Sequence, residues 1–440
     1  MQKIVPKRLA TTIMNSLKGG VVPRVGLEHI AVGRTDEINA LLHDIDIISE
    51  GGATFRFIVG KYGSGKSFLL QTIRNNAMSK GFVLVDADLS PERRLQGTNK
   101  QGLATYKELI QNMSTKTKPD GGALPLILEK WISTVLSEVS IETGLNPDED
   151  AFSRAAEAKI HKIIIEVEGM VNGFDFSRVI TQYWQAYKNG DDTKKSAVLR
   201  WFRGEYATRT EAKRELGVNL IVTDDNWYDF IKLFAFFLVK AGYKGLLVLI
   251  DELVNIFKIP NSTTRQYNYE KILMMYNDAL QGKAQYIGII MGGTPECIED
   301  KHKGVFSYDA LRSRLSEGRF ATSDVKDMFA PIIRLNPLTA EEMYVLIEKL
   351  AQIHSGLYDY ELNITADGLE SFLKVEYARV GATTNITPRE IIRDFIELLN
   401  IAFQNPQKTI AQIMGADTFE FSKNEITDDE IHKEFADFEV

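Results

Sequence analysis

The sequence predicts an α/β fold, in which helices cover both faces of a parallel β-sheet and a smaller helical domain follows. Apolar runs at 82–88, 246–250 and 284–293 have the composition of parallel strands that are buried on both faces. A glycine-rich loop joins another apolar run, at 54–59, to a helical pattern. From residue 337 onward the pattern changes to helices with clear start signals.

Composition is that of a water-soluble chain of 440 residues, with 44% hydrophobic and 25% charged residues. No apolar run reaches the roughly 18 residues of a membrane span, and the N-terminus lacks the apolar core of a secretory signal. A single cysteine, Cys297, excludes an internal disulfide and a cysteine zinc cluster and fits a reducing cytoplasm. The net charge of −8 argues against a surface that coats nucleic acid, although it allows a local basic patch.

The glycine-rich loop at 60–67 fits G-x-x-x-x-G-K-[ST], the Walker A phosphate-binding motif. Its glycines let the backbone turn successive N–H groups into one concavity, and the following helix adds a partial positive charge. Lys66 can reach the β- and γ-phosphates of ATP, and the Ser67 hydroxyl can ligate Mg²⁺. The predicted ATP contacts are Gly60, Tyr62, Gly63, Ser64, Gly65, Lys66, Ser67 and Phe68.

A Walker B pair, Asp251 and Glu252, follows the apolar run 246–250. Both carboxylates then stand at the carboxyl end of a buried strand, where open α/β sheets bind their ligands. We expect Asp251 to hold Mg²⁺, directly or through water. We expect Glu252 to orient and deprotonate the water that attacks the γ-phosphate.

The long region at about 90–240 contains recurrent helical patterns and predicts a helical insertion in the core. The patterns lie at 104–112, 124–138, 155–171, 176–188 and 210–216. Its basic segments, 93–94 and 194–214, allow a nucleic-acid contact through Arg and Lys with Trp201 and Phe202 interleaved. The alternative is a solvated helix face with a buried aromatic pair.

Helix start signals divide the remaining chain. Thr35 is placed to cap a helix before the first strand, and Thr339 with Glu342 forms a capping box. Another helix starts near Thr365, and a further box follows at 387–390, with proline in the first helical position. The predicted parts are an N-terminal segment (1–30), a core (31–336), a helical lid (337–405) and an acidic tail (406–440).

Together these features resemble the AAA+ class of P-loop NTPases. The resemblance implies a three-layer parallel sheet with a large helical insertion, followed by a helical lid domain. It places Gly33 and Arg34 at the adenine site and gives Thr294 the role of sensor 1, a polar contact to the γ-phosphate or its water. A turn-forming threonine before proline is the alternative for Thr294. Arg389, at the start of the third lid helix, is the implied sensor 2, ahead of Arg393.

The same resemblance implies an arginine finger, which stabilises the transition state at a neighbouring subunit's nucleotide. Three arginines cluster after the sensor 1 position, at 312, 314 and 319. Arg314 is the first choice and Arg312 the second, and surface arginines in local ion pairs are the alternative. A finger in this segment implies a homo-oligomer.

A narrower resemblance links the chain to the BREX phage-defence ATP-binding proteins, the BrxD-like family. It rests on VVPRVGLEHIAVGRTDEI, GKYGSGKSFLL, DADLSPERRLQG, LLVLIDE, MGGTPE, RSRL and ITPREIIRDF. The family implies an AAA+ ATPase that acts beside a helicase or another DNA-processing partner in an antiviral system. Direct contact with DNA stays possible.

Two other functions remain open. One is a nucleotide-dependent switch or loader, in which slow hydrolysis only resets binding to a partner or to DNA. The other is a DNA-binding protein that the phosphate loop regulates, which needs a basic groove that the net charge does not supply.

Overall fold

The computed structural model describes residues 5–316, 327–361, 364–379 and 387–415. The chain divides into two units, which are described separately below. The core unit is Arg34–Asn336, and the helical unit combines Met1–Gly33 with Pro337–Val440. The predicted Arg319 and most of the acidic tail lie outside the described residues.

Five parallel strands form the sheet of the core unit, in the order β2-β3-β4-β1-β5. Their bounds are β1 (Ala53–Val59), β2 (Val83–Asp88), β3 (Leu246–Asp251), β4 (Ile287–Gly293) and β5 (Ile332–Arg334). The α/β class and the parallel sheet are therefore confirmed. Strand β4 separates β1 from β3, so the residue that follows β4 lies between the phosphate loop and the Walker B pair.

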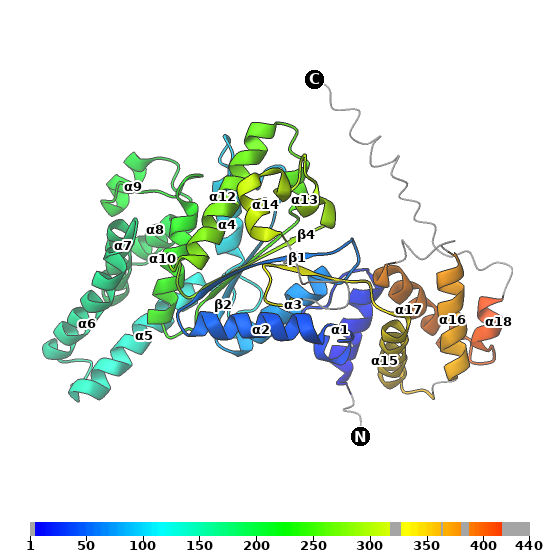
Figure 1. Cartoon of the computed structure of the whole chain (residues 1–440). Helices are drawn as coiled ribbons and strands as arrows, with labels where there is room; N and C mark the ends of the chain where they lie inside the picture. Colours follow the sequence, from blue (N-terminus) through cyan, green and yellow to red (C-terminus); the bar gives the residue numbers. More distant parts are fainter. Residues whose placement is uncertain (1–4, 317–326, 362–363, 380–386, 416–440) are drawn as a thin grey trace. The chain divides into compact units, whose positions relative to one another are not determined.

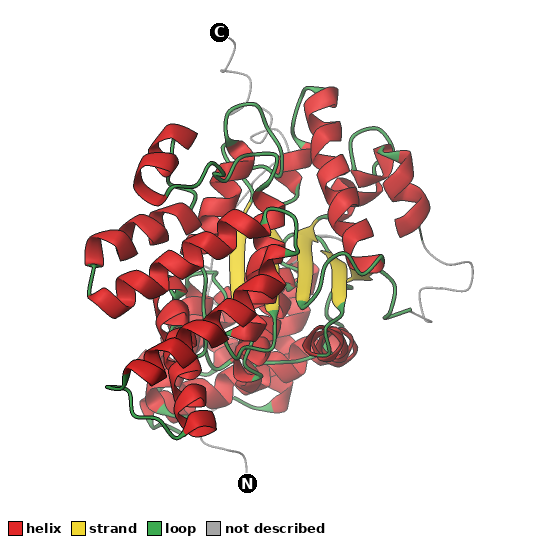
Figure 2. Cartoon of the chain, turned by 90° about the vertical axis from the view of Figure 1, so that its left-hand side faces the viewer, coloured by secondary structure: helices red, strands yellow, loops and turns green. Residues whose placement is uncertain are grey.

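Side chains along each strand alternate between the two faces of the sheet. Because both sets are apolar here, helices cover both faces. Ile58, Leu84 and Leu247 pack with α2 (Thr35–Ser49) and α3 (Lys66–Ser79). Phe57, Val85 and Val248 belong to a larger apolar core on the other face. That core includes α4 (Gln101–Gln111), α10 (Trp227–Lys240) and α12 (Ser262–Leu280). Figures 1 and 2 show the strands with these helices packed against them.

A buried ion pair joins α2 to β1. The Arg56 guanidinium donates from Nε and Nη2 to the two carboxylate oxygens of Asp44, at 2.6 and 2.7 Å. Both side chains are nearly inaccessible to solvent. A two-pronged contact of this kind fixes orientation as well as distance. It therefore holds the helix that precedes the phosphate loop in register with the strand that leads into the loop.

The region after β2 is helical, as predicted. Five of its helices match the predicted patterns, and α8 (Asp192–Phe202) is an addition to them. The others are α4, α5 (Leu124–Thr143), α6 (Asp150–Glu168), α7 (Gly173–Asn189) and α9 (Arg209–Leu216), followed by α10. Phe176 of α7 contacts the rings of Trp201, Phe202 and Phe234. The insertion is thus continuous with the core on one face of the sheet.

Short helices follow β3 and β4 in the core unit. They are α11 (Val254–Phe257), α13 (Pro295–Glu299), η2 (Val305–Ser307) and α14 (Asp309–Leu315). At the start of the core unit, Thr35 is the first residue of α2 and Arg34 occupies the N-cap position without a side-chain cap bond. The prediction that Thr35 caps this helix is wrong, since its backbone is already helical.

The helical unit consists of α1 (Lys7–Lys18), η1 (Leu27–His29), α15 (Ala340–Tyr358), α16 (Ala366–Arg379), α17 (Pro388–Gln404) and α18 (Ile410–Met414). The capping box of Thr339 with Glu342 is confirmed, as is that of Thr387 with Glu390. Helix α1 packs against α15 and α17. The sequence treats 1–30 as a segment of its own, whereas these contacts make it part of the helical unit. Within this segment, η1 lies between α1 and the start of the core unit in the sequence.

Length and composition of the described helices bear on membrane insertion. Among them, none is both long enough and apolar enough to cross a bilayer.

Candidate active site

The predicted phosphate loop, residues 60–67, connects β1 to α3 at the carboxyl edge of the sheet. Gly63 and Gly65 have positive φ angles of 74° and 94°, and Gly65 is the N-cap of α3. Side chains rarely adopt this backbone conformation, so glycine is required at both positions. At Gly60 the constraint is space, because a β-carbon there would overlap Ser64 Oγ and lie 3.2 Å from Leu335 Cβ. The loop is therefore compact. Glycine is needed for its backbone angles at Gly63 and Gly65 and for lack of space at Gly60.

Lys66 lies over the loop that precedes it. Its Nζ donates to the carbonyl oxygens of Gly60 and Lys61, at 2.8 and 3.1 Å. The same Nζ is 5.3 Å from the centre of the Tyr62 ring, which is 59% exposed. Ser67 is exposed in the first turn of α3, and Phe68 beside it is half-buried. An ammonium group in this place can exchange the two carbonyls for phosphate oxygens.

Arg34 holds the loop through a hydrogen bond to its backbone. Its side chain is buried, and its Nη2 donates to the carbonyl oxygen of Ser64 at 2.9 Å. Its Nη1 lies 3.6 Å from the Glu37 carboxylate. The resemblance placed Arg34 at the adenine site, and the structure shows it bonded to the backbone of the phosphate loop. A β-carbon on Gly65 would lie 3.9 Å from Arg34 Nε, so the guanidinium also packs against that glycine.

The predicted Walker B pair, Asp251 and Glu252, lies where β3 ends. Asp251 Oδ1 accepts a hydrogen bond from the Glu252 N–H at 2.8 Å. Glu252 itself has a φ of 62°, which is uncommon for a residue with a side chain and often marks a functional site. In the register of the sheet, Asp88 at the end of β2 lies opposite Asp251. Three carboxylates are thus gathered at the ends of two adjacent strands.

Strand β4 leaves room for the Asp251 carboxylate. A β-carbon on Gly292 would overlap Asp251 Oδ1 and lie 2.9 Å from its Cγ. Any larger residue at 292 would displace the carboxylate. Sequence reasoning missed Gly292, because its only signal is a glycine within an apolar strand, which indicates a close approach without naming the neighbour.

The gathered carboxylates shift one another's protonation. Burial raises the pKa of Glu252 above its ordinary value, and the negative charges of Asp251 and Asp88 raise it further. The positive charges of Lys66 and Lys258 lower the same pKa in part. The pKa of Asp88 is raised as well, first by burial and then by Asp251 and Asp86. A carboxylate whose pKa lies closer to neutral is a better proton acceptor, as a general base requires.

The oxygen donors near the loop fit a magnesium ion that takes its remaining ligands from phosphate and water. Among the described residues, no three His, Cys, Asp or Glu side chains are grouped to hold a metal. Mg²⁺ commonly takes one or two protein oxygens, with phosphate oxygens and water as its other ligands. The Ser67 hydroxyl and the Asp251 carboxylate are hard oxygen donors of this kind.

Thr294 lies at the end of β4, between the loop and the Walker B pair in the strand order. Its side chain is buried, and its hydroxyl and the thiol of Cys297 are 3.1 Å apart. The Thr294 N–H also donates to the same sulfur at 3.3 Å. Thr294 is the N-cap residue of α13, directly before Pro295, whereas the alternative from the sequence was a turn-forming threonine before proline. Its position at the strand end still suits a sensor.

The two candidate finger arginines are exposed on α14 and contact their own helix. Arg312 Nη2 is 2.6 Å from the Asp309 carboxylate, and Arg314 Nη1 donates to the Ala310 carbonyl at 2.8 Å. Gly33 and Arg389 belong to the helical unit, so they are not placed relative to the loop. Arg389 is exposed in the first turn of α17.

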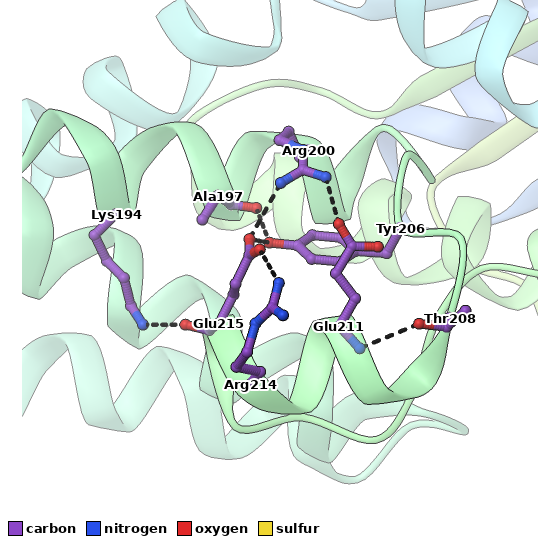
Figure 3. A network of polar contacts seen from close by, with 8 residues as sticks. All are labelled: Lys194, Ala197, Arg200, Tyr206, Thr208, Glu211, Arg214 and Glu215. Atoms are coloured by element: carbon purple, nitrogen blue, oxygen red, sulfur yellow. Dashed lines mark hydrogen bonds and ion pairs between the residues drawn. The ribbon is translucent and has the colours of Figure 1, made fainter.

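The basic segment 194–214 is balanced by acidic side chains of α9. Arg200 Nη2 lies 2.8 Å from Glu211 Oε1, and its Nη1 lies 3.1 Å from Glu215 Oε2. Figure 3 shows Arg214 and the Tyr206 hydroxyl on the same Glu215 carboxylate. Trp201 is only 1% exposed and Phe202 is fully buried. The two rings are therefore not accessible to nucleic-acid bases, which agrees with the buried aromatic pair of the alternative interpretation.

Residues 5–418 match the family described as BREX system ATP-binding protein BrxC/D. Among curated proteins, none matches this chain. The matched range contains the phosphate loop, the carboxylates at the end of β3 and all the described helices.

Proposed function

Since the chain belongs to the BREX system ATP-binding protein BrxC/D family, we propose that it hydrolyses ATP at this site as part of phage defence. The observation that carries the proposal is the juxtaposition at the carboxyl edge of the sheet. The phosphate loop ends β1, the carboxylates end β2 and β3, and β4 lies between β1 and β3.

The residues divide the chemistry among them. The backbone N–H groups of the loop and the start of α3 bind the phosphates, and Lys66 exchanges its loop carbonyls for phosphate oxygens. Ser67 and Asp251 would hold Mg²⁺, whose charge would offset that of the phosphates. Glu252 orients a water and accepts its proton, aided by its raised pKa.

We further propose the AAA+ type of P-loop NTPase, with the helical unit as its lid. Thr294 would act as sensor 1 once its hydroxyl turns from Cys297 toward the phosphate. Arg314, or else Arg312, would complete a neighbouring subunit's site, and Gly33 and Arg389 would respond to the nucleotide from the helical unit. A homo-oligomer follows from this arrangement. A helicase or another DNA-processing protein is the expected partner.

One observation favours the alternative of a nucleotide-dependent switch or loader. Both candidate finger arginines contact their own helix, and the Thr294 hydroxyl is engaged by Cys297. A single chain therefore presents an incomplete hydrolytic set. Its intrinsic turnover should be slow until a neighbour, DNA or a partner protein supplies the rest.

Two substitutions test the hydrolysis proposal. Lys66→Ala should abolish ATP binding, whereas Lys61→Ala, which removes the other, exposed lysine of the loop, should leave binding intact. Glu252→Gln should still bind ATP but lose about 10²–10⁴-fold in turnover, the usual contribution of a general base. Equilibrium binding of a fluorescent ATP analogue and phosphate release are the measurements. A Glu252→Gln protein with wild-type turnover would contradict the assignment.

The choice between hydrolase and switch needs turnover with and without additions. Phosphate release is measured for the chain alone, with duplex or single-stranded DNA, and with the candidate helicase partner. High turnover of the chain alone favours the hydrolase. Native mass measurement with and without ATP reports assembly. Near-zero turnover together with ATP-dependent assembly favours the switch.

A further inference from the structure

We propose that Arg34 is a positioning residue that ties the phosphate loop to both connections between the core unit and the helical unit. Binding of nucleotide to the loop would then change the hydrogen bonding of those connections. The inference rests on the proposed function in one respect, since ATP is the ligand that would occupy the loop.

The chain passes between the two units twice, at 33–34 and at 336–337. Arg34 is the first residue of the core unit, and Asn336 is the last. Arg34 Nη2 donates to the Asn336 carbonyl at 2.7 Å and to the Ser64 carbonyl at 2.9 Å. A single guanidinium nitrogen therefore joins the second connection to the phosphate loop, while its own backbone forms the first.

The neighbouring residues strengthen this link. The Leu335 N–H donates to the Val59 carbonyl at 2.8 Å, at the end of the strand that leads into the loop. A β-carbon on Gly60 would lie 3.2 Å from Leu335 Cβ, so Leu335 packs against the first loop residue. Glu37 faces Arg34 Nη1 at 3.6 Å, which fixes the guanidinium from its other side.

Burial makes the arrangement sensitive to geometry. Arg34 is only 6% exposed, so water does not readily replace a lost hydrogen bond. Binding of phosphates draws the N–H groups of the loop inward, and rotation of those peptide planes moves the carbonyl of Ser64. Hydrogen bonds weaken steeply with such misalignment. A change at Ser64 is therefore passed to the bond that the same nitrogen makes with Asn336.

Only an arginine suits this position. Its planar fork presents several fixed N–H donors, whereas a lysine ammonium is a compact point charge on a flexible stem. Gly33, which directly precedes it, has a φ of 66° and so gives the first connection a backbone that other residues rarely adopt. By reciprocity, a helical unit held in one state would change the affinity of the loop for nucleotide.

Hydrogen exchange in the full chain tests the proposal, with and without a non-hydrolysable Mg·ATP analogue. The wild-type protein should show slowed exchange in the loop, 60–67, and also in the connections, 31–36 and 334–338. Arg34→Lys should still bind the analogue, weakened by about twofold to tenfold for the loss of one hydrogen bond. Slowing should persist in its loop and be lost in its connections.

The matched control is Arg56→Lys, because Arg56 is a second buried arginine of the core unit, which pairs with Asp44 and donates to the Ala330 carbonyl. It should retain slowing in the loop and in both connections. Glu37→Gln provides a second variant if Arg34→Lys does not fold, and it should reduce the slowing at the connections without removing it from the loop.

The outcomes separate the two proposals. Wild-type connections that do not respond while the loop is protected would overturn the role of Arg34, as would an unchanged response in Arg34→Lys. A wild-type protein with no protection even in the loop would overturn both this inference and the proposed ATP site.

Discussion

The Asp251 carboxylate lies against the α-carbon of Gly292 on the adjacent strand, with no room between them for a methyl group. A Gly292→Ala substitution should therefore displace the carboxylate that we assign to Mg²⁺. We expect an apparent Mg²⁺ affinity lower by about 10–100-fold, the usual effect of disturbing the support of a metal ligand. Turnover measured against Mg²⁺ concentration at saturating ATP is the test.

Gly293→Ala is the matched control for that experiment. A β-carbon at 293 would meet Leu253 Cβ at 3.3 Å and Cys297 Sγ at 3.6 Å, and no atom of Asp251 lies closer to it than these. Equal Mg²⁺ dependence of the two variants would show that crowding of β4 in general, and not Asp251, limits activity.

The carboxylates at the ends of β2 and β3 predict a pH dependence of stability. The pKa values of Asp88 and Glu252 are raised in the folded state, so the folded protein binds more protons than the unfolded chain above the ordinary carboxylate pKa. Stability therefore falls as pH rises through the folded-state pKa values. Asp88→Asn should raise the melting temperature at pH 7, and this gain should shrink toward pH 4.

The same substitution should alter the pH profile of hydrolysis. Because the charge of Asp88 helps to raise the pKa of Glu252, its removal should shift the acid limb of turnover to lower pH. An acid limb that does not move would separate Asp88 from the base. Asp36→Asn, on the exposed side of α2, serves as a control for loss of one negative charge.

The arginine finger can be tested by mixing two inactive variants. If Arg314 acts on a neighbour's nucleotide, Arg314→Ala should lose about a thousandfold or more in turnover while it keeps ATP affinity. Mixed with Lys66→Ala, which retains its arginine but binds no ATP, it should regain activity at the mixed interfaces. Arg312→Ala is compared in the same way. Absence of recovery with either variant would contradict a finger supplied by a neighbour.

Thr294 carries two predicted roles that separate experimentally. As the N-cap of α13, its replacement by valine should cost about 1 kcal/mol of stability. As sensor 1, the same change should lower turnover by about 10²-fold or more, as for removal of one transition-state donor. Thr294→Ser should preserve both. A Thr294→Val protein with reduced stability but normal turnover would leave the cap as its only role.

Much of the fold was predictable because its signals are local. The apolar runs that became β2, β3 and β4 are long enough to be recognised, and the capping boxes at Thr339 and Thr387 are complete in sequence. Strand β5 has only three residues, Ile332–Arg334, and such a length carries no periodicity. Thr35 was misplaced by one position, since a capping residue and a first helical residue share the same local sequence pattern.

The site was predictable residue by residue but not pair by pair. The phosphate loop and the Walker B pair are motifs, whereas the approach of Gly292 to Asp251 depends on β3 and β4 being neighbours. The bond from Arg34 to Ser64 joins residues that the sequence assigned to different parts of the nucleotide. Trp201 is a case in which local sequence misleads. The basic residues around it suggested an exposed side chain, whereas it is buried in the core against Phe176.

The helical unit is made from both ends of the chain, and this has a consequence for biosynthesis. The apolar face of α1, with Ala10, Ile13 and Met14, is covered by helices that end as late as Gln404. At roughly 5–20 residues per second, α17 leaves the ribosome about 20 to 80 s after α1. The core unit can fold during that interval, while α1 waits with its apolar side exposed. A nascent chain halted before residue 388 should therefore be a substrate for chaperones, even with a finished phosphate loop.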